Sequence, residues 1–164
     1  MIITSKYFIK MDEIDNIGFS KENNLLLFDF GLCVCVKRFS MESSAYQMTG
    51  NTGSLRYMAP EVALSMPYNE KVDMYSFCIL FWEMATGKVP FQGATKKDFM
   101  RYVVREGVRP DIPYLWSKAL RTMLTQGWDP DYRQRPSFHE ILVILQELSG
   151  LSKSAAPTEY ENGI

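Results

Sequence analysis

Residues 69–87 read NEKVDMYSFCILFWEMATG and predict the central helix of the fold. Asn69 is a favourable residue for starting a helix, and Gly87 suits the position that follows a last turn at Thr86. The interior, residues 74–82, is apolar on every side. A helix of this kind cannot lie on a surface, so other elements must surround it.

Helical patterns continue after this segment. Residues 95–98 (TKKD) resemble a capping box and precede apolar residues at helical spacing. A helix is expected over 113–126, where the apolar stripe consists of Leu115, Leu120, Met123 and Leu124. Residues 137–140 (SFHE) form a second capping box, which opens a last helix through Leu148. The sequence therefore predicts a mainly α fold.

Strand-like pieces lie before the central helix. Residues 16–19 and 25–28 are apolar and are separated by the polar run 20–24, a pattern typical of a β-hairpin. The stretch from Gly31 to Ala59 is rich in Ser, Thr and Gly and has no clean period. A loop of that length in one domain is usually functional or mobile.

Composition excludes several classes of function. The 164 residues fit one domain, and with 46% hydrophobic and 23% charged residues they indicate a soluble protein. The net charge of −1 provides no global field for nucleic acid or an anionic membrane, so we expect neither as a partner. Residues 1–6 do not resemble a signal peptide, and the run 77–82 is too short to span a membrane. These features indicate a cytoplasmic or nuclear protein.

The cysteines do not predict a metal site. Cys33, Cys35 and Cys78 contain no C-x-x-C pair, and His139 lies far from them in sequence. A structural zinc ion needs about four suitably spaced ligands. Reduced thiols are the better interpretation.

Three short motifs occur in a fixed order along the chain. They are Asp15-Asn16-Ile17-Gly18-Phe19, Asp29-Phe30-Gly31 and Tyr57-Met58-Ala59-Pro60-Glu61. Together they resemble the catalytic loop end, the D-F-G and the A-P-E of a protein kinase, and are closest to the tyrosine-kinase-like serine/threonine kinases. The resemblance continues through residues 73–77, 82–87, 107–110, 128–130 and 135–138. It implies a kinase C-terminal lobe over 15–149 and leaves 1–14 as a non-matching segment. Residues 150–164 have no period, so we expect a disordered tail there.

The resemblance implies ATP and Mg²⁺ as cofactors and a protein substrate or protein partner, and it gives several residues a role. Asn16 and Asp29 match the two magnesium ligands. The activation segment is matched by Asp29, Phe30, Gly31, Ser54, Ala59, Pro60 and Glu61. Three residues match structural positions: Glu61 and Arg135 a buried ion pair, and Asp73 a carboxylate that holds the catalytic-loop backbone.

The sequence departs from the kinase pattern at the catalytic loop. Met11 stands at the expected position of the catalytic Asp, and Glu13 stands where a Lys is usual. No G-x-G-x-x-G or V-A-I-K occurs in the sequence, so we expect the N-lobe, which forms the adenine pocket, to be absent. Because the helices that cover the central helix in kinases are not recognisable either, we expect Leu80, Phe81 and Trp82 to lose burial.

Three hypotheses follow for function. The chain is part of a longer serine/threonine kinase, and is inactive as an isolated chain. Alternatively, it is a pseudokinase-like binding module that uses its helical lobe without catalysis. The third hypothesis is an unstable remnant with no function.

Overall fold

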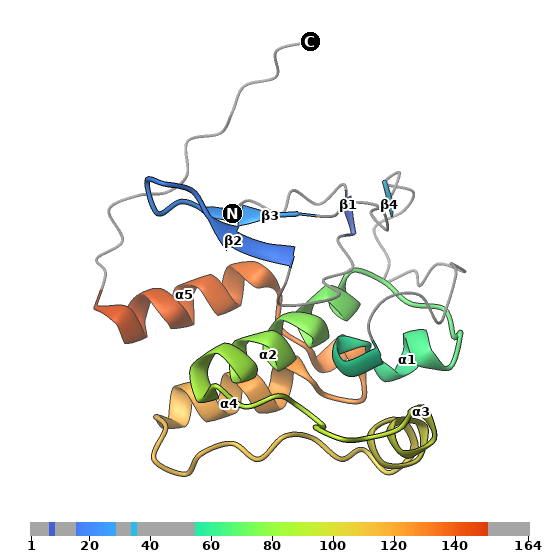
Figure 1. Cartoon of the computed structure of the whole chain (residues 1–164). Helices are drawn as coiled ribbons and strands as arrows, with labels where there is room; N and C mark the ends of the chain where they lie inside the picture. The colour runs from blue at the N-terminus through green and yellow to red at the C-terminus, as the bar shows by residue number, and fades with distance from the viewer. Residues whose placement is uncertain (1–6, 9–15, 29–33, 36–54, 151–164) are drawn as a thin grey trace.

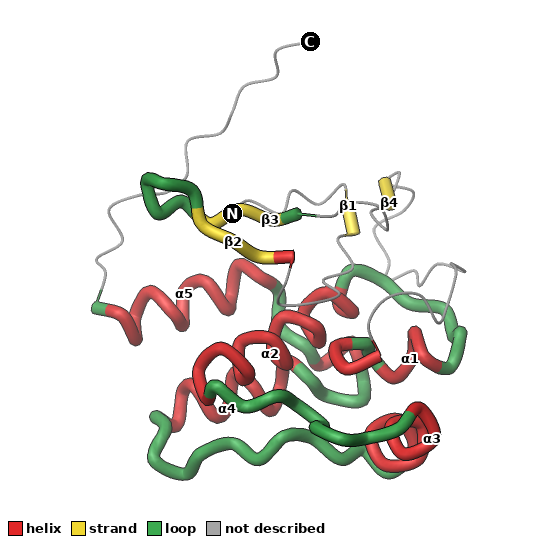
Figure 2. Tube along the Cα trace, in the orientation of Figure 1, coloured by secondary structure: helices red, strands yellow, loops and turns green. Residues whose placement is uncertain are grey.

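The computed structural model describes residues 7–8, 16–28, 34–35 and 55–150, and Figure 1 shows how these parts are arranged. The strands are β1 (Tyr7–Phe8), β2 (Ile17–Phe19), β3 (Leu25–Leu27) and β4 (Val34–Cys35). The α-helices are α1 (Pro60–Ala63), α2 (Lys71–Thr86), α3 (Lys96–Asp98), α4 (Lys118–Gly127) and α5 (Phe138–Ser149). Two 3₁₀ helices, η2 (Leu55–Tyr57) and η4 (Tyr132–Gln134), and one π-helix, η3 (Phe99–Arg105), complete the described helices. The described part is thus mainly helical, as predicted, and Figure 2 shows the helices gathered on one side of the strands.

Helix α2 is the centre of the fold. Its side chains Tyr75, Cys78 and Ile79 are completely buried, and the helix ends at Gly87, which adopts a left-handed φ of 65°. The predicted cap residue, Asn69, lies one position before the observed one. Glu70 occupies the cap position, and the Asn69 side chain accepts a hydrogen bond from the backbone N–H of Lys71 at 3.1 Å.

The expected loss of burial along α2 was wrong for two residues. Leu80 and Trp82 are buried, and the Trp82 indole N–H donates to the Asp111 carbonyl at 2.9 Å. The loop after η3 therefore covers this side of the helix. Phe81 is half-buried and packs against Phe77, with ring centroids 6.0 Å apart.

Helix α4 packs directly on α2 at a position where no side chain fits. A Cβ on Gly127 would collide with the Cys78 sulfur, so the glycine permits the close approach of the two helices. Met123 and Leu124 are fully buried beside it. Burial raises the pKa of the Cys78 thiol to about 12, so this cysteine is an inert part of the core.

The prediction for the start of α4 was wrong by five residues. The helix begins at Lys118 because the Ser117 side chain caps it, accepting from the Leu120 N–H at 3.2 Å. The residues before it form a loop, and Leu115, expected on the apolar stripe, is 80% exposed. Pro113, predicted as the first helical residue, instead precedes a turn.

Both predicted capping boxes are confirmed. In each, the hydroxyl of Thr95 or Ser137 accepts from the backbone N–H three residues later, and the acid at that position, Asp98 or Glu140, accepts from the cap. Helix α5 ends at Gly150 with a left-handed φ of 66°. What the pattern did not predict is that the helix after Thr95 continues as a π-helix.

The predicted hairpin is present as β2 and β3. The strands are antiparallel, with Ile17 opposite Leu27 and Phe19 opposite Leu25. Strands β1 and β4 form a second antiparallel pair, with Tyr7 opposite Cys35. That pair joins the N-terminal segment to the stretch predicted as an irregular loop.

Candidate functional site

The hairpin places Asn16, one of the two predicted magnesium ligands, beside Phe28, the residue that precedes the other ligand in sequence. Asn16 immediately precedes β2, and its carbonyl accepts a hydrogen bond from the Phe28 N–H at 2.8 Å. Asp29 follows Phe28 in sequence but lies outside the described residues. No described residue hydrogen-bonds to the half-buried side-chain amide of Asn16. An amide oxygen and a carboxylate are ligands that suit Mg²⁺, and the joint role of Asn16 and Asp29 stays a prediction.

Several predicted site residues lie outside the described part of the chain. These are Met11, Asp29, Phe30, Gly31 and Ser54. Their roles stay predictions, as does the replacement of the catalytic Asp by Met11. Over the described residues, no group of three or more His, Cys, Asp or Glu side chains is arranged to hold a metal ion.

The segment 57–61 is fastened to α2 by buried polar contacts. The Tyr57 hydroxyl donates to a Glu83 carboxylate oxygen at 2.6 Å, and the Ser76 hydroxyl donates to the Tyr57 carbonyl at 2.8 Å. Burial, together with the nearby Glu83 carboxylate, raises the pKa of Tyr57 to about 12. The phenol therefore stays protonated and keeps donating its hydrogen bond throughout the neutral pH range.

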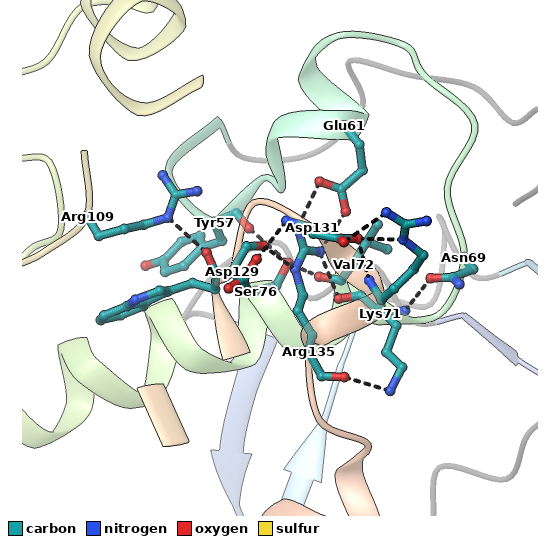
Figure 3. A network of polar contacts seen from close by, with 12 residues as sticks. Tyr57, Glu61, Asn69, Lys71, Val72, Ser76, Arg109, Asp129, Asp131 and Arg135 are labelled. Atoms are coloured by element: carbon teal, nitrogen blue, oxygen red, sulfur yellow. Dashed lines mark hydrogen bonds and ion pairs between the residues drawn. The ribbon is translucent and has the colours of Figure 1, made fainter. Parts of the chain in front are cut away.

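Glu61 and Arg135 form a bidentate ion pair in the core. Arg135 Nη1 and Nη2 donate to the two Glu61 carboxylate oxygens at 2.6 and 3.0 Å (Figure 3). The guanidinium also donates to the carbonyls of Asp129 at 2.8 Å and Lys71 at 3.1 Å. Because the Arg135 side chain is completely buried, these acceptors replace its hydration. The pair links α1 to the segment before α5 across 74 residues of sequence.

Two arginines enclose an aromatic ring of α2. The guanidinium carbons of Arg109 and Arg135 lie 5.1 and 5.2 Å from the centroid of the Tyr75 ring. Arg109 also donates to the Trp128 carbonyl at 3.1 Å and the Val103 carbonyl at 3.0 Å. The two cation–π contacts tie the segments that contain Arg109 and Arg135 to α2.

Asp73 lies in the first turn of α2, where it is buried. The segment that its carboxylate is expected to hold, residues 9–15, lies outside the described residues. Its role as a support of the catalytic loop therefore stays a prediction. Among the predicted structural residues, the structure places Glu61 and Arg135 together, and Asp73 in α2, whose Lys71 carbonyl accepts from Arg135.

The sequence interpretation missed the contacts of Tyr57, Glu83 and Tyr75. A signal for the first pair was available, because Glu83 is an acid in the mostly apolar second half of α2 and a buried carboxylate requires a partner. Nothing in the spacing indicated that the partner would be Tyr57, 26 residues away. The stacking of Tyr75 depends on Arg109, which reaches it from a loop.

Comparison with known proteins identifies the lineage of this architecture. A family model described as protein tyrosine and serine/threonine kinase matches residues 13–145. A probable serine/threonine-protein kinase of Dictyostelium discoideum is 35% identical over 81% of this chain and 14% of its own length. In Arabidopsis thaliana, serine/threonine-protein kinase STY46 is 35% identical over 95% of this chain and 30% of its own length. Serine/threonine/tyrosine-protein kinase HT1 of the same plant is 36% identical, covering 84% of this chain and 36% of its own length.

The helical lobe, the hairpin and the anchored segment 57–61 define a protein of the kinase class. The chain belongs to the protein tyrosine and serine/threonine kinase family, whose model covers most of it. It spans between 14% and 36% of the length of the three relatives. None of the helices in the described part combines the length and the apolar composition that crossing a bilayer requires.

Proposed function

We propose that the chain is the C-terminal lobe of a serine/threonine protein kinase, which within a longer polypeptide transfers phosphate from ATP to a protein. The observation that carries this proposal is the buried Glu61–Arg135 pair, which fixes the end of a kinase-like activation segment to the helical lobe. An ordered anchor of this kind supports the loop on which a protein substrate would lie.

The proposed roles of the site residues are those of positioning. Asn16 and Asp29 would hold Mg²⁺, which when bound neutralises charge on the nucleotide phosphates. Tyr57 and Glu61 hold the two ends of the segment 57–61 against α2 and against Arg135. Ser54 would lie where the substrate residue to be phosphorylated is seated. The position of the catalytic base is occupied by Met11, which cannot accept a proton as the expected Asp would.

We expect the chain as written to be inactive and to bind ATP weakly, because the adenine pocket of kinases is formed by the N-lobe. The complete transcript tests the proposal. An upstream region that encodes H-R-D, V-A-I-K and a Gly-rich loop is the expected result. A complete transcript without them would remove the basis for a longer, active kinase.

A second candidate function is a kinase-derived binding module that works without catalysis. Exposed apolar side chains favour it: Phe19 is 69% exposed and Phe28 is 52% exposed on the hairpin. Affinity purification of the tagged chain tests this candidate. A specific partner recovered in stoichiometric amounts supports it, whereas recovery of chaperones alone contradicts it.

A further inference from the structure

The hairpin leaves one strand of its two-stranded sheet without a second neighbour. Ile17 of β2 packs against the hydrophobic core, so β2 is the inner strand. None of the three leucines of β3, residues 25–27, belongs to the core cluster or packs against it. In the part of the chain that the structure describes, no strand pairs with the outer edge of β3. This strand is therefore an open edge made of consecutive leucines.

The hydrogen bonds of the hairpin show which backbone groups of β3 point outward. The Phe28 N–H donates to the Asn16 carbonyl at 2.8 Å, so these two residues form a hydrogen-bonded pair. Bonded and unbonded pairs alternate along an antiparallel ladder, and the next bonded pair in this register is Gly18 with Leu26. The N–H and C=O groups of the leucines on either side of Leu26 therefore point away from β2.

The side chains along this edge do not protect it from pairing. Residues 23–28 read NNLLLF and contain neither a charged residue nor a proline, the features that usually keep an edge strand from adding another strand. Leu25 is 48% exposed and Leu26 is 39% exposed. A two-stranded hairpin is only marginally stable by itself, so a further strand on this edge would stabilise it.

A second copy of the chain has an edge that complements this one. In an antiparallel pairing about a two-fold axis at Leu26, Leu25 of each copy lies opposite Leu27 of the other. These are the residues whose backbone groups point outward, so each of the two pairs can exchange two hydrogen bonds. The two Leu26 side chains then meet at the axis, and no charge within residues 23–28 faces its own equivalent there.

We propose that the chain forms a symmetric dimer through the outer edge of β3, in which two hairpins join into one four-stranded antiparallel sheet. A second copy fits better than an unrelated extended segment because the two-fold pairing closes both β3 edges with the same residues. The proposal rests on the second candidate function, whose partner at the exposed hairpin it names, and it requires no phosphate transfer. Because the shared edge is short, we expect a dissociation constant of about 1–100 µM.

Sedimentation equilibrium of the full chain, from about 1 to about 200 µM, tests the proposal, and a monomer–dimer equilibrium is the expected result. Leu26→Lys places two like charges opposite each other at the axis, and we expect it to raise the dissociation constant at least about tenfold. The control Leu115→Lys introduces the same charge at a leucine that is 80% exposed elsewhere on the chain. We expect the control to change the dissociation constant by less than about twofold.

A mixture of two charge variants tests the geometry of the pairing. Leu26→Glu alone should weaken the dimer as Leu26→Lys does. An equimolar mixture of the two variants should pair to within about threefold of the wild type, because opposite charges then meet at the axis. Circular dichroism establishes that each variant is folded, and the wild-type measurement tests the dimer independently of any variant.

Several results would overturn the proposal. These are a wild-type chain that stays monomeric or forms open-ended assemblies instead of dimers, equal weakening by Leu115→Lys, and a charge-swapped mixture that does not pair. A monomeric chain that still recovers a stoichiometric partner in the affinity purification would overturn the self-pairing and leave the second candidate function standing. A dimer with the predicted response at Leu26 supports the proposal.

Discussion

At the scale of single residues, the account depends on polar groups that are buried in pairs. The Arg135 side chain has no exposed surface and that of Glu61 is nearly as buried; the two pair with each other, and Arg135 also donates to two backbone carbonyls. Such a pair adds little net stability compared with apolar residues, but the loss of one member leaves a charge in the core. The pair therefore acts mainly to specify how α1 meets the segment before α5.

Removing one member of this pair should be severe. Arg135→Met leaves Glu61 buried without its cation, and we expect the free energy of unfolding to fall by about 3–5 kcal/mol. Urea unfolding followed by tryptophan fluorescence measures it. The matched control is Arg133→Met, which breaks an exposed ion pair with Asp131 and should barely move the midpoint. Similar losses in both variants would show that the buried pair has no special role.

The Tyr57 hydroxyl should be needed to satisfy a buried acid. Tyr57→Phe removes the 2.6 Å donor to Glu83, and we expect a loss of about 1–3 kcal/mol because a buried acceptor is left without its partner. Tyr102→Phe, at an exposed position, is the control and should leave the urea midpoint unchanged. A neutral effect of Tyr57→Phe would mean that Glu83 finds another donor.

Tyr57 should also contribute to the stability of the chain at alkaline pH. The pKa of Tyr57 is about 12 in the folded chain and about 10 in a solvated tyrosine. Because the folded-state pKa is the higher one, its stabilising contribution is complete below pH about 10 and disappears as the pH rises toward 12. Between these values, the free energy of unfolding should fall more steeply with pH in the wild type than in Tyr57→Phe. Parallel pH profiles would contradict the assignment.

At the scale of elements, the contact of α2 with α4 depends on a missing side chain. Gly127→Ala places a methyl group against the Cys78 sulfur, and the helices must separate. We expect a loss of about 1–3 kcal/mol from this overpacking, although alanine has the better helix propensity. The exposed neighbouring position gives the control, since Gln126→Ala should be neutral or slightly stabilising in thermal unfolding. A Gly127→Ala variant that is more stable than the wild type would show that α2 and α4 accommodate the added methyl group without loss of stability.

How far the elements could be predicted differs along the chain. The capping boxes at Thr95 and Ser137 set two helix starts correctly because side chain and backbone bond within four residues. The start of α4 was missed because Ser117 competes with Pro113 as a first-turn signal, and only packing decides between them. The burial of Trp82 could not be predicted because its cover is a loop that reaches α2 from Asp111.

The candidate site shows the same division. The kinase motifs located Glu61, Arg135 and Asn16 in advance, and the fold brings the first two together. The contact of Tyr57 with Glu83 was not predictable, since η2 must turn the phenol inward before the two side chains meet. Local signals therefore placed the motifs, whereas their partners depend on tertiary packing.

At the scale of the whole molecule, the described part is a helical lobe built around α2. Segments from the hairpin to α5 pack on that helix. The Tyr57 contact fastens the segment 57–61 to α2, and the Glu61–Arg135 pair fastens it to the segment before α5. The proposed kinase lobe positions a substrate loop, and Met11 at the expected position of the catalytic Asp is one reason why we expect the isolated chain to be inactive.

The most direct measurement is phosphate transfer by the purified chain. The protein is incubated with radiolabelled ATP, Mg²⁺ and a generic protein substrate with Ser and Thr acceptors, beside the variant Asp29→Ala. A cooperative thermal transition in circular dichroism establishes that both proteins are folded. The account predicts that incorporation by the wild type equals that of Asp29→Ala. Incorporation by the wild type above that variant would contradict it.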